Sequence, residues 1–179
     1  AAATGEFWPV FCASLADVFD NEVPAEWRRD LFNLILSTPH LTWLLLTKRI
    51  GNAEQMIQEV LPEEMQRLPS DHLLAWPWPH VWIGATVVNQ QEADRDIPKL
   101  LATPAAKRFL SIEPMLGAID LTNLDGPAKQ SGAHGWSCLW DTPLRSRIDA
   151  VILGGETGPG ARPMHINWVR SIRDQCSAA

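Results

Sequence analysis

Residues 41–49, "LTWLLLTKR", decide the fold, because a continuous apolar run ends there in two adjacent charges. Apolar residues at nearly every position are typical of a short strand that is buried on both faces of a sheet. Four further segments carry runs of the same kind, at residues 8–15, 80–88, 106–116 and 147–158. The sequence therefore predicts five buried strands.

Stretches with helical spacing separate these runs. They lie within residues 17–39, where a loop precedes the helix and Pro24 suits its start, and at residues 52–68, 89–104 and 165–176. Strands that alternate with helices predict βαβ units and a parallel sheet. We therefore expect an α/β fold, a parallel-stranded partial (βα) barrel that is TIM-barrel-like, with about five strands. Residues 1–179 are expected to form a single incomplete barrel domain, with an irregular excursion at about 117–147.

The composition excludes several classes of protein. The chain has 179 residues and a net charge of −6, which argues against general attraction to nucleic acid or to an anionic membrane. No apolar run approaches the roughly 20 residues that span a bilayer, so no membrane partner is expected. The first residues lack the layout of a signal peptide, which favours a cytoplasmic location. Cys12, Cys138 and Cys176 lie far apart, which argues against a zinc site and a disulfide scaffold.

Residues 75–82, "AWPWPHVW", hold three of the nine tryptophans. The alternating prolines disfavour both a helix and a central strand. We interpret the segment as an extended lead-in whose indole rings pack over the bottom of the barrel. A carbohydrate-stacking platform is the alternative.

Polar or charged residues follow each predicted strand. In parallel α/β folds the carboxyl ends of the strands meet at one mouth, where ligands bind. Lys48 and Arg49 are consecutive and point to opposite sides, so at most one of them enters a barrel. The candidates at this mouth are Ser14, Asp17, Thr47, Lys48, Thr86, Glu113 and Glu156.

Two glutamates stand out among these candidates. Glu113 and Glu156 each follow an apolar strand closely, and a charge so near an apolar interior needs a partner or a ligand. Glu156 lies in residues 151–164, "VILGGETGPGARPM", whose glycines allow a ligand or another backbone to come close. Arg162 is suited to a bidentate contact with a carboxylate or a phosphate. An ordinary structural turn also explains this stretch.

Five segments together resemble a phage-associated family of unassigned function, the gp thirty-seven/gp sixty-eight family. The resemblance covers nearly the whole chain, in the family's order. That family is similar to radical SAM enzymes, in which a partial (βα) barrel holds an iron–sulfur cluster and S-adenosylmethionine. The segments are "VFCASLADVFDNEVP", "WLLLTKR", "VWIGATVVNQ", "RFLSIEPMLGAIDL" and "VILGGETGPGARPM".

The resemblance implies roles for the residues at the mouth. In such barrels, groups at successive strand ends hold the amino, carboxylate and ribose parts of the cofactor. The residues that it places at the cofactor are Ser14, Asp17, Thr47, Thr86, Glu156 and Arg162. Its candidates for a catalytic role are Lys48, Glu113 and Glu156.

The cluster-binding cysteine motif of the family has no counterpart in this sequence. Cys12 falls inside a predicted strand, and Cys138 and Cys176 are remote from it. We therefore expect an incomplete form that is inactive by itself. S-adenosylmethionine and the iron–sulfur cluster are expected in a full-length form, and no cofactor in this one. The substrate, a small molecule or a nucleic acid, is not identified.

Two other interpretations stay open. In the first, the chain is an inactive barrel remnant or an interaction module. Its open barrel edges would then need to be covered by a partner protein or by a second copy of the chain. In the second, Glu113 and Glu156 are the carboxylate pair of a (βα)-barrel glycoside hydrolase. The residues before them, Ile112 and Gly155, do not match the asparagine usual before the acid of such enzymes.

Overall fold

The computed structural model describes residues 8–12, 16–69, 72, 74–125, 137–139 and 147–179. The chain divides into two compact units. The first unit comprises residues 1–84 and 103–107, and the second comprises residues 85–102 and 108–179. The expectation of a single domain stays a prediction.

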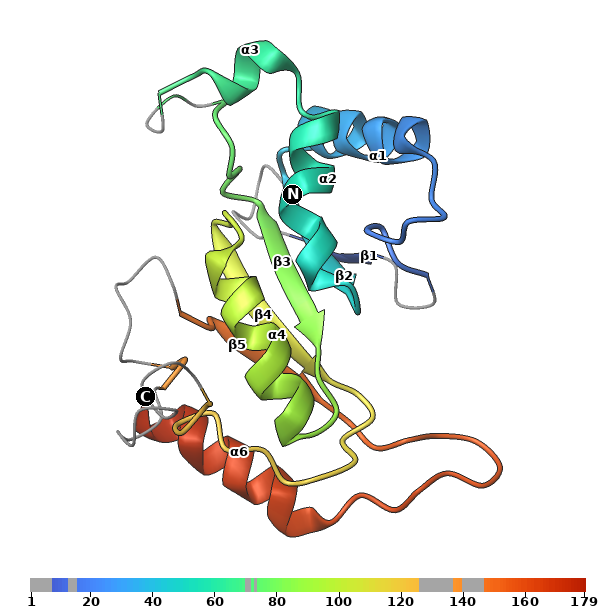
Figure 1. Cartoon of the computed structure of the whole chain (residues 1–179), viewed down its shortest axis with the longest axis vertical. Helices are drawn as coiled ribbons and strands as arrows, with labels where there is room; N and C mark the ends of the chain where they lie inside the picture. Colours follow the sequence, from blue (N-terminus) through green and yellow to red (C-terminus); the bar gives the residue numbers. More distant parts are fainter. Residues whose placement is uncertain (1–7, 13–15, 70–71, 73, 126–136, 140–146) are drawn as a thin grey trace. The chain divides into compact units, whose positions relative to one another are not determined.

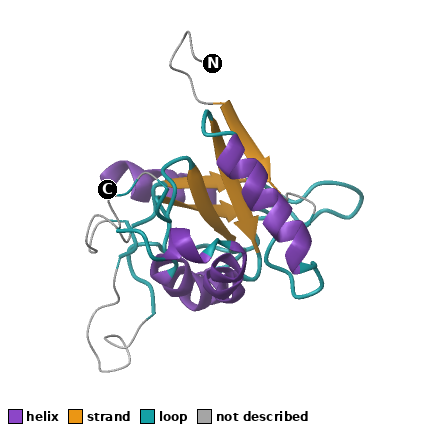
Figure 2. Ribbon diagram, turned by 90° about the horizontal axis from the view of Figure 1, so that it is seen from above, coloured by secondary structure: helices purple, strands orange, loops and turns teal. Residues whose placement is uncertain are grey.

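The five predicted strands form one parallel sheet, in the order β1-β2-β3-β4-β5 (Figure 2). Each strand lies beside the one before it in the chain, which is the order of a partial (βα) barrel. The predicted fold class is therefore confirmed. The strands are β1 (Trp8–Cys12), β2 (Leu41–Thr47), β3 (Val81–Thr86), β4 (Lys107–Ile112) and β5 (Ala150–Leu153).

Helices follow the strands at the predicted places (Figure 1). They are α1 (Ala25–Ser37), α2 (Ile50–Val60), α3 (Glu63–Gln66), α4 (Gln90–Ala102) and α6 (Ile166–Ala178). The single helix expected over residues 52–68 is two helices, because Pro62 disfavours the helical conformation at Leu61, whose φ is −71° and ψ 132°. Pro98, by contrast, lies inside α4.

The core of the first unit lies between β2 and the helices α1 and α2. Phe32 and Ile35 of α1 are buried, as is Ile57 of α2. Leu45 of β2 is 0% exposed, as expected for the middle of a strand covered on both faces. These side chains fix β2, and with it the polar residues that follow the strand.

The tryptophans of the "AWPWPHVW" segment pack into this unit. The rings of Trp76 and Trp78 lie 5.9 and 6.0 Å from the ring of Phe32, and Trp78 is 2% exposed. Trp76 Nε1 donates a hydrogen bond of 3.1 Å to the carbonyl oxygen of Pro104. Both indoles pack within the unit, and Trp78 offers almost no surface to a sugar.

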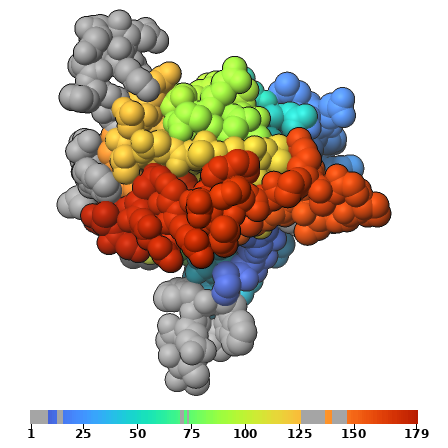
Figure 3. All heavy atoms as spheres, turned by 90° about the horizontal axis from the view of Figure 1, so that it is seen from below, coloured from blue at the N-terminus to red at the C-terminus, as the bar shows by residue number. Residues whose placement is uncertain are grey.

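The second unit buries the apolar face of α4 and the middle of β4. Ala93 and Ile97 of α4 and Phe109 of β4 are all 0% exposed. Helix α6 buries only Ile172 and forms an exposed ridge, red in Figure 3. Within residues 117–147, the part that the structure describes contains no helix and no strand longer than a single bridge residue, as expected for an irregular excursion.

Candidate functional site

The polar residues after β2 are joined to Asp17 in the first unit. Thr47 Oγ1 donates a hydrogen bond of 2.7 Å to Asp17 Oδ1, and the Lys48 backbone N–H donates one of 2.8 Å to Oδ2. The Phe19 N–H also donates to Oδ1, at 3.0 Å. Arg49 Nη1 lies 3.6 Å from Oδ2. We call these residues the Asp17 network.

Every polar side-chain atom of Asp17 and Thr47 has a partner from the chain itself. Thr47 Oγ1 donates to Asp17 and accepts from the Arg49 N–H at 2.8 Å. Both residues are buried, so these bonds offset the cost of removing their polar atoms from water. The network holds the turn at residues 16–20 against the end of β2. The Lys48 side chain is exposed, and Ser14 lies outside the described residues.

The strand ends of the second unit place four residues on one face of the sheet. The Val87 N–H donates to the Ser111 carbonyl at 3.1 Å, which in a parallel ladder sets Thr86 beside Ser111. Glu113 lies two residues after Ser111, on the same face. Since Ile112 pairs with Leu153, Glu113 lies beside Gly154. We call Thr86, Ser111, Glu113 and Gly154 the strand-end cluster.

The Glu113 carboxylate lies across the backbone of Gly154. Ser111 Oγ donates a hydrogen bond of 3.1 Å to Glu113 Oε2. A Cβ added to Gly154 would lie 2.8 Å from Glu113 Oε1, closer than real Cβ atoms approach another atom. Glycine at position 154 therefore makes room for the carboxylate. Among the described residues no cation lies within ion-pair distance of Glu113, and the side chain is exposed.

The hydroxyl of Thr86 has no hydrogen-bond partner in the part of the chain that the structure describes. Thr86 is 8% exposed, and its Oγ1 is buried without a hydrogen bond to any described residue. A buried hydroxyl left in this state costs about 1–3 kcal/mol. It lies on the face that carries Ser111 and Glu113, so a bound group on that face would supply the missing bond.

Glu156 and Arg162 bind each other in the loop after β5. Arg162 Nη2 donates to Glu156 Oε1 at 2.7 Å, and Arg162 Nε and its backbone N–H both donate to Oε2 at 2.8 Å. These bonds lower the pKa of the Glu156 carboxyl to about 2. Gly158 and Gly160 turn the loop with φ of 97° and 77°, which favour glycine. Arg162 thus makes the bidentate contact with a carboxylate that an arginine side chain favours, and that carboxylate belongs to the same loop.

Comparison with known protein families gives one match, to a family described as a protein of unknown function (DUF5131), over residues 6–179. The chain belongs to this family. Searches of curated proteins and of solved structures gave no match. The family carries no assigned activity, so the function of this member has to be argued from its site.

The described cysteines do not fit an iron–sulfur cluster in this member of the family. Cys12 lies in β1, Cys176 in α6 and Cys138 in the excursion between β4 and β5. Within the described part of the chain, no group of three His, Cys, Asp or Glu side chains is placed to hold a metal ion. Burial raises the pKa of all three thiols, that of Cys138 to about 12, which disfavours the thiolate that binds iron.

The strand-end cluster does fit the polar part of a small ligand. A carboxylate and two hydroxyls can accept from, and donate to, the hydroxyl or amino groups of a nucleoside or an amino acid.

The described helices include none that is long and apolar enough to cross a bilayer.

Sequence reasoning found most of the cluster but missed Ser111. Thr86 and Glu113 were predicted from their places after strands, and the Gly154 backbone was expected to lie close to another group. The missed signal was the Ser-x-Glu spacing from Ser111 to Glu113, since residues two apart in a strand share a face. The cofactor-binding roles of Ser14, Asp17, Thr47, Thr86, Glu156 and Arg162 stay predictions.

Proposed function

We propose that the strand-end cluster binds a small polar ligand that carries hydroxyl or ammonium groups. The observation that carries this proposal is the buried Thr86 hydroxyl, which no described residue satisfies. Buried hydroxyls in proteins nearly always have a partner, and a bound ligand is the partner that we propose for this one.

The neighbouring groups of the cluster define the chemistry of the ligand. Glu113 is acceptor-only when ionised, and Ser111 uses its proton on Oε2, which leaves Oε1 to receive a donor from the ligand. Thr86 can both donate and accept. Gly154 lets a bound group approach the backbone closely, because nothing projects from its Cα. Vicinal hydroxyls or an ammonium group meet these demands.

S-adenosylmethionine is the ligand that the family resemblance favours. Its ribose hydroxyls and amino group have the chemistry that the cluster accepts. The same resemblance supports, as a proposal, membership of the gp thirty-seven/gp sixty-eight family and a radical-SAM-like ancestry. The described residues supply no cluster site, so no cluster-dependent chemistry is assigned to them. Free cysteines are typical of a reducing compartment, which supports a cytoplasmic location.

A glycoside hydrolase is less well supported. That chemistry needs two carboxyl groups, one of which is protonated when the reaction starts. Glu156, one of the two candidates, has both oxygens bound by Arg162 and a pKa of about 2, which keeps it ionised and occupied. Glu113 then has no second catalytic carboxyl among the proposed pair.

Calorimetric titration of the chain tests the proposal. The ligands are S-adenosylmethionine, S-adenosylhomocysteine, adenosine and methionine, which separate the sulfonium, nucleoside and amino-acid parts. We expect saturable binding of S-adenosylmethionine, weakened about tenfold by Thr86→Val and by Glu113→Gln, the loss of one hydrogen bond each.

A matched control is Glu64→Gln, which removes one exposed carboxylate of the first unit and should leave the affinity unchanged. Absence of saturable binding by all four ligands would overturn the proposal. So would affinities that Thr86→Val and Glu113→Gln leave at the wild-type value.

A further inference from the structure

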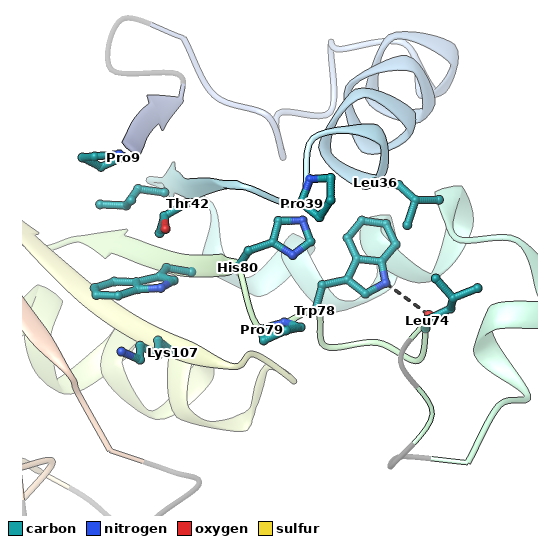
Figure 4. A pocket seen from close by; sticks show the side chains of 11 residues that line it. Pro9, Leu36, Pro39, Thr42, Leu74, Trp78, Pro79, His80 and Lys107 are labelled. Carbon is teal, nitrogen blue, oxygen red and sulfur yellow. Dashed lines mark hydrogen bonds between the residues drawn. The ribbon is translucent and has the colours of Figure 1, made fainter. Parts of the chain in front are cut away.

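The first unit contains an apolar cavity of about 850 Å³ that the strand-end cluster does not involve (Figure 4). Its lining includes the beginnings of β2, β3 and β4 and the segment that leads into β3. The side chains that matter most for its chemistry are Thr42, Leu44, Trp78, His80, Trp82 and Lys107. Pockets for small molecules have volumes of roughly 300–1,000 Å³ and mostly apolar walls.

The cavity lies on the face of β2 opposite to the buried core. Side chains alternate along a strand, so Thr42 and Leu44 point away from the face that carries Trp43 and Leu45. Trp43 and Leu45 are buried, whereas Thr42 and Leu44 are half-buried. The Trp43 N–H donates to the His80 carbonyl at 2.8 Å, which in the parallel ladder brings Trp82 beside Leu44. Two strands thus supply adjacent apolar walls.

Hydrogen bonds hold the aromatic walls in place. Trp78 Nε1 donates to the Leu74 carbonyl at 3.2 Å, the dashed line in Figure 4. His80 Nε2 lies 3.2 Å from the carbonyl of Ile35, and its ring stacks on Trp78 with an angle of 6° between the planes. A cavity whose walls are already fixed loses little conformational entropy when a ligand binds.

The cavity carries one positive charge and no acidic residue in its lining. Lys107 Nζ lies 4.7 Å from the centroid of the Trp82 ring, a cation–π contact. Among the described residues, no carboxylate lies within ion-pair distance of Lys107. An ammonium group beside an apolar, aromatic cavity is complementary to a molecule with an aromatic body and one negative charge.

We propose that this cavity binds an aromatic monoanion, whose rings lie against Trp82 and Leu44 and whose acidic group meets Lys107. A second copy of the chain fits less well. An isologous contact through the same patch brings two Lys107 ammonium groups of like charge into one interface. The proposal concerns the first unit and does not depend on the ligand of the strand-end cluster.

Fluorescence titration of the full chain with anilinonaphthalene sulfonate tests the proposal. Its uncharged analogue phenylnaphthylamine shares the aromatic body and lacks the anion. We expect both probes to bind, and Lys107→Gln to weaken the sulfonate about three- to fivefold while leaving the uncharged probe unchanged. Thr42→Phe replaces a small side chain of the cavity wall by an aromatic ring that narrows the cavity, and should weaken the binding of both probes. Near-ultraviolet circular dichroism checks that each variant keeps its packed core.

Arg29→Gln is the matched control, because it removes one exposed positive charge of α1 outside the cavity lining. Equal weakening by Arg29→Gln and Lys107→Gln would overturn the proposal, as would affinities for both probes that Thr42→Phe leaves at the wild-type value. Sedimentation completes the test. A dimer that Thr42→Phe dissociates would assign the cavity to self-association and overturn binding of a small anion.

Discussion

The Asp17 network and the strand-end cluster are built from the same residue types at the same kind of position. Each has a threonine at the end of one strand and a carboxylate that follows another strand, Asp17 after β1 and Glu113 after β4. Thr47 is bonded to Asp17 and to the Arg49 N–H, whereas Thr86 has no hydrogen-bond partner among the described residues. The residue type at a strand end therefore does not tell whether the chain itself satisfies its polar atoms. The difference lies in which polar atoms the chain itself satisfies.

The difference predicts opposite responses to mutation. Removing a group from a satisfied network leaves its partners buried and unpaired, which destabilises the fold. Removing a polar atom that has no partner among the described residues eliminates a cost, so the fold should gain stability, while the proposed ligand binding should weaken. The four predictions below test this contrast, from the largest expected effect to the smallest.

Asp17→Ala should lower the free energy of unfolding by about 3 kcal/mol, because it leaves the Thr47 hydroxyl and the N–H groups of Phe19 and Lys48 without their acceptor. Urea denaturation followed by circular dichroism measures the change. Asp30→Ala, on the exposed surface of α1, is the control and should change the free energy little. A loss equally small for Asp17→Ala would show that the network does not hold the turn.

The two threonines should respond to valine in opposite directions. Thr47→Val breaks two hydrogen bonds and should cost about 1–2 kcal/mol. Thr86→Val replaces an unsatisfied hydroxyl by a methyl group and should leave the ligand-free protein unchanged or more stable by about 1 kcal/mol. The same denaturation experiment compares both. If Thr86→Val destabilises the protein as much as Thr47→Val, its hydroxyl has a partner within the chain.

Gly154→Ala should push the Glu113 carboxylate away from Ser111. The expected loss is about 0.5–1 kcal/mol, the value of one hydrogen bond, since the flexible carboxylate can move to make room for the new methyl group. In a Glu113→Ala background the effect of Gly154→Ala should disappear, which a double-mutant cycle measures.

Gly155→Ala is the matched control for that cycle. A Cβ at position 155 would meet Met164 Cβ at 3.6 Å, an ordinary contact. Losses of equal size at both glycines would mean that the carboxylate does not lie across Gly154.

The smallest effect concerns the pH response of the loop after β5. The pKa of the Glu156 carboxyl falls from 4.5 to about 2 in the folded chain, so the Arg162 pair stabilises the fold above pH 4.5. That contribution is lost as the pH falls from 4.5 towards 2. Nuclear magnetic resonance of the carboxyl carbon should show a midpoint near 2, moving towards 4.5 in Arg162→Gln. A midpoint that Arg162→Gln leaves in place would assign the low pKa to another cause.

The strands were predictable because each is marked by a local feature of the sequence. The apolar run before Thr47 and the run before Glu113 both end within a residue of the observed strands β2 and β4. Burial on both faces produces such runs, and burial is a property of the whole fold class. Pro62 marks the break between α2 and α3, but the helical spacing of the residues on both sides predicts one continuous helix.

The partners at the site were not predictable in the same way. Thr47 is satisfied because a turn after β1 brings Asp17, which lies 30 residues earlier in the chain, to the end of β2. Thr86 has no such turn among the described residues. The pairing of Arg162 with Glu156 depends on the turn made by Gly158 and Gly160 between them. The places of these polar residues follow from strand periodicity, whereas their hydrogen bonds follow from loop conformation, which the apolar pattern does not encode.

The loop closed by Glu156 and Arg162 has a practical use. At its tip, a Cβ built on Gly158 or Gly160 has no described atom within 4 Å, and Thr157 is exposed. The bidentate ion pair at the base holds the two arms together whatever is attached to the tip. A spectroscopic label attached to Thr157→Cys would therefore lie on a loop with a fixed base just after β5. Its signal would respond to ligand binding near Gly154 and Glu113 without the label entering the core.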